Sequence, residues 1–139
     1  MRLSNDIRGE IVSHARSVLP EEACGLLAVD SDGCVRHAYC LTNVDRSSSS
    51  FTLDPDEHYA SLVDAESRGW VLGGSFHSHP RTAAVPSQTD ISRALEPDWV
   101  YLIVGLADPE TPELRGWWIR TGVAVEEPIE VVPVTEGAR

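Results

Sequence analysis

Lysine is absent from this sequence of 139 residues, and all eleven basic residues are arginines. Without an ε-amine on any side chain, the protein cannot itself be a target of lysine conjugation. Positive charge is scarce overall, because the formal net charge is −11. Nucleic acids and anionic membranes are bound through basic patches, so we expect neither as a partner.

Long apolar runs are also missing, since no run approaches the roughly 20 residues of a membrane-spanning helix. The first ten residues, MRLSNDIRGE, contain no apolar segment of the signal-peptide kind, so we expect a cytoplasmic protein without a signal peptide. Cysteine is limited to Cys24, Cys34 and Cys40, an odd number with no C-x-x-C pair. This pattern favours reduced thiols over a disulfide framework or a zinc knuckle, and it predicts Cys24 in the core.

The length predicts one domain that spans residues 1–139. A first helix is expected from Asn5 to Leu19, because Ser4 can cap it and apolar residues recur on one face. The start signal Asp54-Pro55-Asp56-Glu57 predicts a second helix that ends near Arg68. A short third helix is expected after Ser87.

Six strands are predicted from apolar runs bounded by turn residues. They are the stretches ACGLLAV, CVRHAYCL, WVLGGSF, WVYLIVGL, ELRGWWIR and IEVVPV. The small polar residues of NVDRSSSS, before the second helix, predict a mobile flap. Helices and strands in this mixed order favour an α/β fold in which helices sandwich one sheet.

The stretch GGSFHSHPRTAAVPSQTD, residues 73–90, has two interpretations. His77 and His79 can be strand residues on one face, and Ser87 with Asp90 can be a capping box. Each piece alone is more often structural, by about three to one. Together, two imidazoles and a carboxylate can supply three ligands to a zinc ion that keeps one position open.

A hydrolytic metal site also needs a base and an oxyanion donor, and two further residues are candidates. Glu21 is interpreted as a solvated surface acid. Glu22 lies at the entrance to a buried strand, where a carboxylate is harder to explain as a solvated surface group. The Ser87 hydroxyl can donate to an oxyanion beside the metal. The remaining histidines lack partners at ligand spacing and are interpreted as surface residues; they are His14, His37 and His58.

The motif His77-Ser78-His79-Pro80, then six residues, then Ser87-x-x-Asp90, with Glu22-x-Cys24-Gly25-Leu26-Leu27 upstream, resembles the JAMM (MPN+) metalloprotease family. The resemblance implies a single MPN domain, with a mixed, cytidine-deaminase-like sheet of about six strands between two longer helices and one short helix. It implies that His77, His79 and Asp90 bind zinc. Glu22 would pass a proton from the attacking water to the leaving amine, and Ser87 would steady the oxyanion.

Members of the JAMM family hydrolyse amide bonds at the C-terminal glycine of ubiquitin-like proteins. This chain most resembles the stand-alone actinobacterial members that release cysteine from a sulfur-carrier protein during cysteine synthesis. The resemblance therefore implies a substrate of the ThiS/MoaD type, cleaved after its terminal Gly-Gly. We expect the extended tail to bind as an added strand beside a sheet edge, with Arg81 as a contact.

Other functions fit the sequence less well. A non-catalytic MPN scaffold would not need the intact ligand set. Zinc content would discriminate such a scaffold from a zinc hydrolase. A JAMM isopeptidase acting on another ubiquitin-like adduct remains an alternative substrate assignment. An amidohydrolase barrel needs roughly 250 residues. A zinc deaminase needs a P-C-x-x-C element, which this chain does not contain.

Overall fold

The computed structural model describes residues 1–134, and the predicted domain's last five positions, 135–139, lie outside them. The helices are α1 (Asn5–Ser17), α2 (Pro55–Ser67) and α3 (Gln88–Arg93). The strands are β1 (Arg2–Ser4), β2 (Cys24–Val29), β3 (Val35–Leu41), β4 (Val71–His79), β5 (Val100–Gly105), β6 (Glu113–Arg120), β7 (Val123–Glu127) and β8 (Glu130–Val132).

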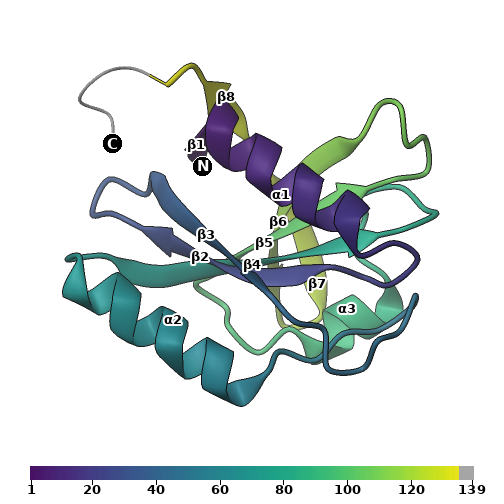
Figure 1. The fold of residues 1–139 in the computed structure, drawn as a ribbon, viewed down its shortest axis with the longest axis horizontal. Helices are drawn as coiled ribbons and strands as arrows, with labels where there is room; N and C mark the ends of the chain where they lie inside the picture. Colours follow the sequence, from purple (N-terminus) through teal and green to yellow (C-terminus); the bar gives the residue numbers. More distant parts are fainter. Residues whose placement is uncertain (135–139) are drawn as a thin grey trace.

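Six strands form the main sheet in the order β3-β2-β4-β5-β6-β7 (Figure 1). The pair β4 and β5 is parallel and the other neighbours are antiparallel, so the predicted mixed sheet is confirmed. The predicted sixth strand, residues 129–134, forms as β8 but does not join the main sheet. The prediction of a single sheet is wrong at this point, because β8 pairs with β1 in a separate two-stranded sheet. Instead, β7, which was not predicted as a strand, completes the main sheet.

The strand β4 lies inside the sheet, between β2 and β5. Its backbone groups are therefore paired on both sides, and a substrate tail cannot add to it as a new strand. The expectation of a sheet edge beside the histidines is wrong for this reason. The open edges of the sheet belong to β3 and β7.

Helix α1 covers one face of the sheet, and α2 and α3 lie on the other (Figure 1). Side chains alternate along β4, so Phe76 points to the α1 face, where it meets the ring of His14 edge-on. The main apolar cluster lies on this face, around Phe76 and Leu102. His77 and His79 consequently share the opposite face with α3 and a smaller cluster that contains Ile103.

The helix boundaries follow their predicted signals. The Ser4 hydroxyl accepts from the Ile7 amide at the start of α1, and Asp54 caps α2. Gly69 follows α2 with φ of +76°, a conformation that favours glycine. Helix α1 ends at Ser17, two residues before the predicted Leu19, with Val18 as its C-cap.

Two further expectations about single residues have opposite outcomes. Cys24 is fully buried, as predicted. His14 is not an ordinary surface residue, because its half-buried ring lies 3.1 Å from the Leu41 carbonyl oxygen and packs against Phe76. Within residues 1–134, no helix has the length and apolar character needed to cross a membrane.

Candidate metal centre and active site

Three ligand-type atoms converge where β4 ends and α3 begins. The Nε2 atoms of His77 and His79 are 3.3 Å apart, and the Asp90 Oδ2 lies 3.2 Å from the first and 3.0 Å from the second. The sequence placed these residues together by spacing, and the structure brings them into one cluster. Both histidines are buried, and the Asp90 side chain is 11% exposed.

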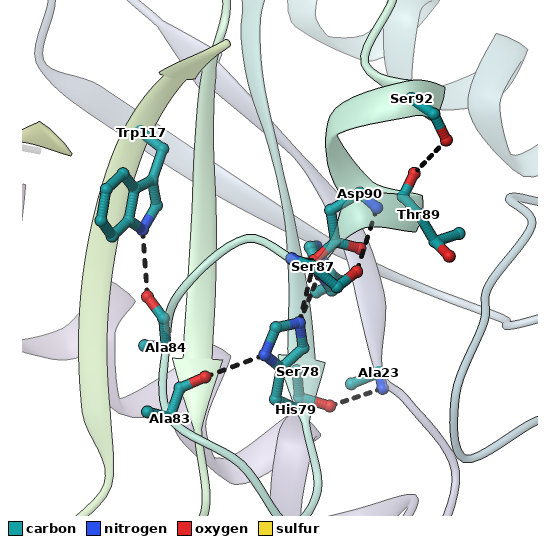
Figure 2. A network of polar contacts seen from close by, with 11 residues as sticks. Ala23, Ser78, His79, Ala83, Ala84, Ser87, Thr89, Asp90, Ser92 and Trp117 are labelled. Atoms are coloured by element: carbon teal, nitrogen blue, oxygen red, sulfur yellow. Dashed lines mark hydrogen bonds and ion pairs between the residues drawn. The ribbon is translucent and has the colours of Figure 1, made fainter. Parts of the chain in front are cut away.

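The hydrogen bond on the far side of His79 fixes its tautomer. Its Nδ1 lies 2.9 Å from the Ala83 carbonyl oxygen, which can only accept, so Nδ1 carries the proton (Figure 2). In a neutral ring Nε2 then presents a lone pair to the Asp90 carboxylate, which is itself rich in lone pairs. A cation at the centre of the cluster removes this repulsion, and a carbonyl-bound imidazole is the usual partner of a metal ion.

The spacing of the three atoms also fits zinc. Tetrahedral zinc with bonds of about 2.0–2.1 Å separates its ligand atoms by about 3.3–3.4 Å. The observed separations of 3.0, 3.2 and 3.3 Å are close to that edge length. Two imidazoles and one carboxylate leave a fourth position open, so the cluster is consistent with a catalytic metal site.

The capping box and the ligand cluster are one structure rather than two alternatives. The Ser87 amide donates to Asp90 Oδ2 over 2.9 Å, and the Asp90 amide donates back to the Ser87 hydroxyl oxygen over 3.0 Å (Figure 2). The box therefore holds Oδ2 against both histidines. The Ser87 hydroxyl uses its oxygen as an acceptor here, so its own proton is free to donate elsewhere.

Charge and burial act in opposite directions on this cluster. Burial disfavours the charged form of Asp90, but bonds from His77 and His79 outweigh it and hold its pKa well below the usual range. Burial likewise disfavours protonated His79, yet the bonds to Asp90 and Ala83 raise its pKa. Both shifts favour an ionised carboxylate that faces a positive charge.

His77 is not held by a hydrogen bond in the way that His79 is. Its Nδ1 is buried and has no hydrogen-bond partner among the described residues. The Phe51 ring stacks on the imidazole instead, with centroids 4.8 Å apart and planes at 25°. Phe51 was missed from the sequence, although it is a lone aromatic after four serines. The stack places loop 43–53 against the cluster.

Ser78, between the two histidines, brings Glu22 to the site. The Ala23 amide donates to the Ser78 hydroxyl over 2.7 Å (Figure 2). The Ser78 amide donates back to the Ala23 carbonyl oxygen over 3.0 Å. Glu22, the residue before Ala23, is 6% exposed. Its burial raises the pKa of the carboxyl to about 7, with His79 acting in the opposite direction. A carboxyl with this pKa can exchange protons at neutral pH.

The segment predicted as a mobile flap begins with a residue that packs. Asn43 is buried, and its side-chain amide donates to the carbonyl oxygens of Glu22 and Ser50 over 3.0 and 2.9 Å. Its side-chain oxygen accepts from the amides of Asp45 and Thr52. The sequence did not single out Asn43, although asparagine before a turn commonly bonds the backbone two residues on.

A cavity of about 270 Å³ opens beside the cluster, and His77 and Asp90 form part of its wall. Residues of loop 49–53, α3 and strands β5 and β6 complete it. Arg93 and Arg81 are both exposed, but of the two only Arg93 lines this cavity. Arg93 was missed, although it lies three residues after Asp90 on the same helix, a spacing that places two side chains on neighbouring parts of one face.

Comparison with known proteins identifies the class to which this fold and site belong. The family described as prokaryotic homologs of the JAB domain matches residues 4–120. The chain therefore belongs to this family, the stand-alone prokaryotic branch of the JAMM/MPN proteins. The predicted MPN fold and family resemblance are thereby confirmed.

Two relatives indicate the class of reaction. The chain is 40% identical over 132 residues to the CysO-cysteine peptidase of Mycobacterium tuberculosis, covering 91% of this chain and 88% of that protein. It is 42% identical over 109 residues to the desampylase of Haloferax volcanii, covering 74% and 78%. Both names describe hydrolases, and the protein is a hydrolase of this family.

Solved structures agree on the fold. A protein from Desulfitobacterium hafniense superposes with a TM-score of 0.90 and 38% identity, covering 99% of this chain and 96% of that one. A JAB1/MPN domain protein from Archaeoglobus fulgidus has a TM-score of 0.61 at 21% identity, covering 95% and 96%. The arrangement of the sheet and helices is therefore that of JAB1/MPN domains.

Proposed function

We propose that this protein is a zinc-dependent hydrolase that cleaves the amide bond after the C-terminal Gly-Gly of a ubiquitin-like sulfur-carrier protein of the ThiS/MoaD type and releases cysteine. The observation that carries the proposal is the convergence of His77, His79 and Asp90 within 3.3 Å beside a cavity. The CysO-cysteine peptidase relative, matched over 91% of this chain, supports the choice of substrate.

His77, His79 and Asp90 are proposed to hold the metal, because their free ligand atoms face one point. Bound zinc would supply Lewis acidity and make water a better nucleophile at neutral pH. The chain's own contribution is to keep the histidine rings fixed, through the Ala83 carbonyl and the Phe51 stack. With three protein ligands, the fourth position of a tetrahedral zinc ion would stay open to water or substrate.

Glu22 is proposed as the general base and then the general acid. As a carboxylate it takes one proton from the attacking water, whose oxygen joins the carbonyl carbon of the terminal glycine. The carbon–nitrogen bond then breaks, and Glu22 gives the proton to the departing amine. The products are the carrier's C-terminal carboxylate and a free amine. The raised pKa of Glu22, about 7, suits both halves of this transfer.

Ser87 is proposed to donate its hydroxyl proton to the oxyanion that forms during the attack. The geometry supports this role, because the hydroxyl oxygen accepts from the Asp90 amide while its proton remains available. A donor of this kind contributes about 10²–10³ to the rate of other acyl-transfer enzymes.

The test uses a carrier that ends in Gly-Gly-cysteine and a matched carrier whose last glycine is alanine. The zinc-loaded protein should release cysteine from the first and act much more slowly on the second, since a Cβ next to the scissile bond obstructs the approach. Mass spectrometry of the carrier's C-terminus gives the readout. Equal cleavage of both, or of neither beside rapid hydrolysis of unrelated peptides, contradicts the proposal.

A different ubiquitin-like adduct is the second candidate, because the desampylase relative covers 74% of this chain. A carrier joined through an isopeptide bond to a lysine side chain distinguishes it. Faster hydrolysis of the isopeptide adduct than of the cysteine adduct would favour this alternative. A protein that binds carriers but hydrolyses neither adduct after zinc loading would instead be a scaffold.

A further inference from the structure

The cavity beside the ligand cluster has a size suited to a single amino acid. Its volume of about 270 Å³ is slightly below the roughly 300–1,000 Å³ of pockets for drug-sized ligands. Apolar side chains of Tyr101, Ile103 and Ile119 contribute to its wall, and His77 and Asp90 join it to the reaction centre. Part of the substrate next to the scissile bond can therefore occupy it.

Arg93 supplies the only arginine among the residues that line this cavity. Within the described part of the chain it forms no salt bridge; its Nη2 lies 3.4 Å from the Thr52 hydroxyl, and its guanidinium lies over the Phe51 ring at 6.0 Å. Four other arginines of this acidic protein pair with carboxylates, namely Arg2, Arg36, Arg68 and Arg115. The described arginines that form no salt bridge besides Arg93 lie outside the cavity lining; they are Arg8, Arg16, Arg46, Arg81 and Arg120. An arginine without a carboxylate partner beside a reaction centre has its hydrogen-bonding capacity available for an anion.

The charges around the site give this arginine a specific use. Glu22 and Asp90 are both acidic, and the protein's net charge is −11, so a ligand that carries a carboxylate would be repelled without a nearby cation. Arg93 lines the same cavity as His77 and Asp90. A leaving group that enters this cavity from the reaction centre therefore meets the guanidinium of Arg93.

We infer that Arg93 binds the α-carboxylate of the amino acid that leaves, so that the site selects a free amino acid over a protein lysine as leaving group. The inference rests on the proposed function and adds the reason for its choice of adduct. In a carrier–cysteine adduct, the carboxylate is two bonds from the scissile nitrogen, within reach of a planar guanidinium that donates to both carboxylate oxygens. In an isopeptide adduct, no carboxylate lies near the scissile nitrogen.

The experiment compares two carriers that end in Gly-Gly-cysteine, one with a free carboxylate and one with a C-terminal carboxamide of the same shape. The zinc-loaded wild type should hydrolyse the carboxylate form with a kcat/KM about 10- to 100-fold higher, as expected for a hydrogen-bonded charge pair. Arg93→Gln should bring that ratio close to one, mainly by slowing the carboxylate form. Arg93→Lys should give an intermediate ratio, because lysine keeps the charge but cannot donate two parallel N–H bonds to a carboxylate.

Arg16→Gln is the matched comparison, since Arg16 is an exposed arginine on α1 that does not line the cavity. It should keep the wild-type ratio. A wild-type ratio near one, a ratio that survives in Arg93→Gln, or a ratio lost only in Arg16→Gln would overturn the inference. Zinc content and circular dichroism of each variant establish that it is folded.

Binding to the metal-free protein separates this inference from the proposed function. Calorimetric titration should show tighter binding of the carboxylate form in wild type and equal binding of both forms in Arg93→Gln. If neither form is hydrolysed but this difference in binding is present, the hydrolase proposal fails and the recognition stands. If both forms are hydrolysed and bound equally by wild type, the recognition fails and the hydrolase proposal stands.

Discussion

The side-chain amide of Asn43 donates a hydrogen bond to the main-chain carbonyl oxygen of Glu22 over 3.0 Å. On the other side, the Glu22 amide donates to the Ser47 carbonyl oxygen over 2.8 Å. The backbone of the proposed base, Glu22, is therefore held by loop 43–53 at both its amide and its carbonyl oxygen. This loop also carries Phe51, which stacks on His77, so one segment positions both the base and a ligand.

Replacement of Asn43 by alanine should slow the reaction without removing the metal ligands. The change leaves several buried backbone groups unpaired, so we expect the free energy of unfolding to fall by about 1–3 kcal/mol. Because Glu22 loses its fixed position, kcat should fall while zinc content and KM stay near wild type. Chemical denaturation, elemental analysis and steady-state kinetics measure these quantities.

Val44→Ala provides the control for Asn43, since Val44 lies in the same loop and is 52% exposed. It should change neither stability nor kcat appreciably. If Asn43→Ala lowers stability alone and leaves kcat unchanged, the loop has a structural role only.

The ligand set and the helix starts could be predicted from the sequence because each depends on residues close together in the chain. His77 and His79 share a strand face, and Ser87 and Asp90 form a capping box within four residues. The same local patterns located α1 and α2 through Ser4 and the Asp54 cap.

The missed features depend on contacts between distant segments. Asn43 reaches Glu22 across 21 residues, and the Arg93 side chain reaches Thr52 across 41. No local pattern encodes such contacts, because the topology of the sheet alone brings the segments together. The strand β7 was missed for a related reason: it is an edge strand with exposed valines, Val123 and Val125, so its pattern lacks a buried face.

The purified protein should hold about one zinc ion per chain, and His77→Ala or Asp90→Ala should lose most of it. Three ligands are the usual minimum for a tightly held zinc ion with an open position, so two should not suffice. His58→Ala is the control, because His58 lies on α2 outside the cluster. Elemental analysis that finds no zinc in the wild type, either before or after zinc loading, would contradict the metal-site assignment.

Removal of zinc by a chelator should also lower the melting temperature of the wild type. A ligand that binds only the folded state stabilises it by mass action. The same chelator should have little effect on His77→Ala. Calorimetry of wild type and His77→Ala, each with and without added zinc, gives the comparison. A melting temperature that does not change with zinc in either protein would contradict the prediction.

Ser87 combines a structural and a proposed chemical role, and two substitutions separate them. Ser87→Ala should cost about 1 kcal/mol of stability through the lost cap and about 10²–10³ in rate through the lost donor. Ser87→Asp restores a cap but places a negative charge beside the oxyanion, so it should be stable and slow. Both variants should keep zinc, since the Ser87 amide that holds Asp90 belongs to the main chain. A stable and fully active Ser87→Asp protein would leave only the capping role.

Glu22→Gln should keep zinc and lose orders of magnitude in rate, because it removes the proposed base and none of the three clustered ligand atoms. Parallel loss of zinc and activity would make Glu22 a ligand or a structural residue. The zinc-loaded wild type is the reference, and the two measurements are made on the same preparations.

The metal-free Glu22→Gln protein should in addition be more stable than metal-free wild type at pH 8, but not at pH 4.5. Burial raises the pKa of Glu22 to about 7 from an ordinary value of 4.5. The folded state therefore binds this proton more tightly than the unfolded state, and the stability that the neutral carboxyl allows is lost as pH rises from 4.5 through 7. Glutamine has no proton to lose, so the difference should grow over that interval to on the order of 1–3 kcal/mol. Urea unfolding at several pH values, with a chelator present, measures it; a difference that does not depend on pH would show that Glu22 is not buried in its charged form.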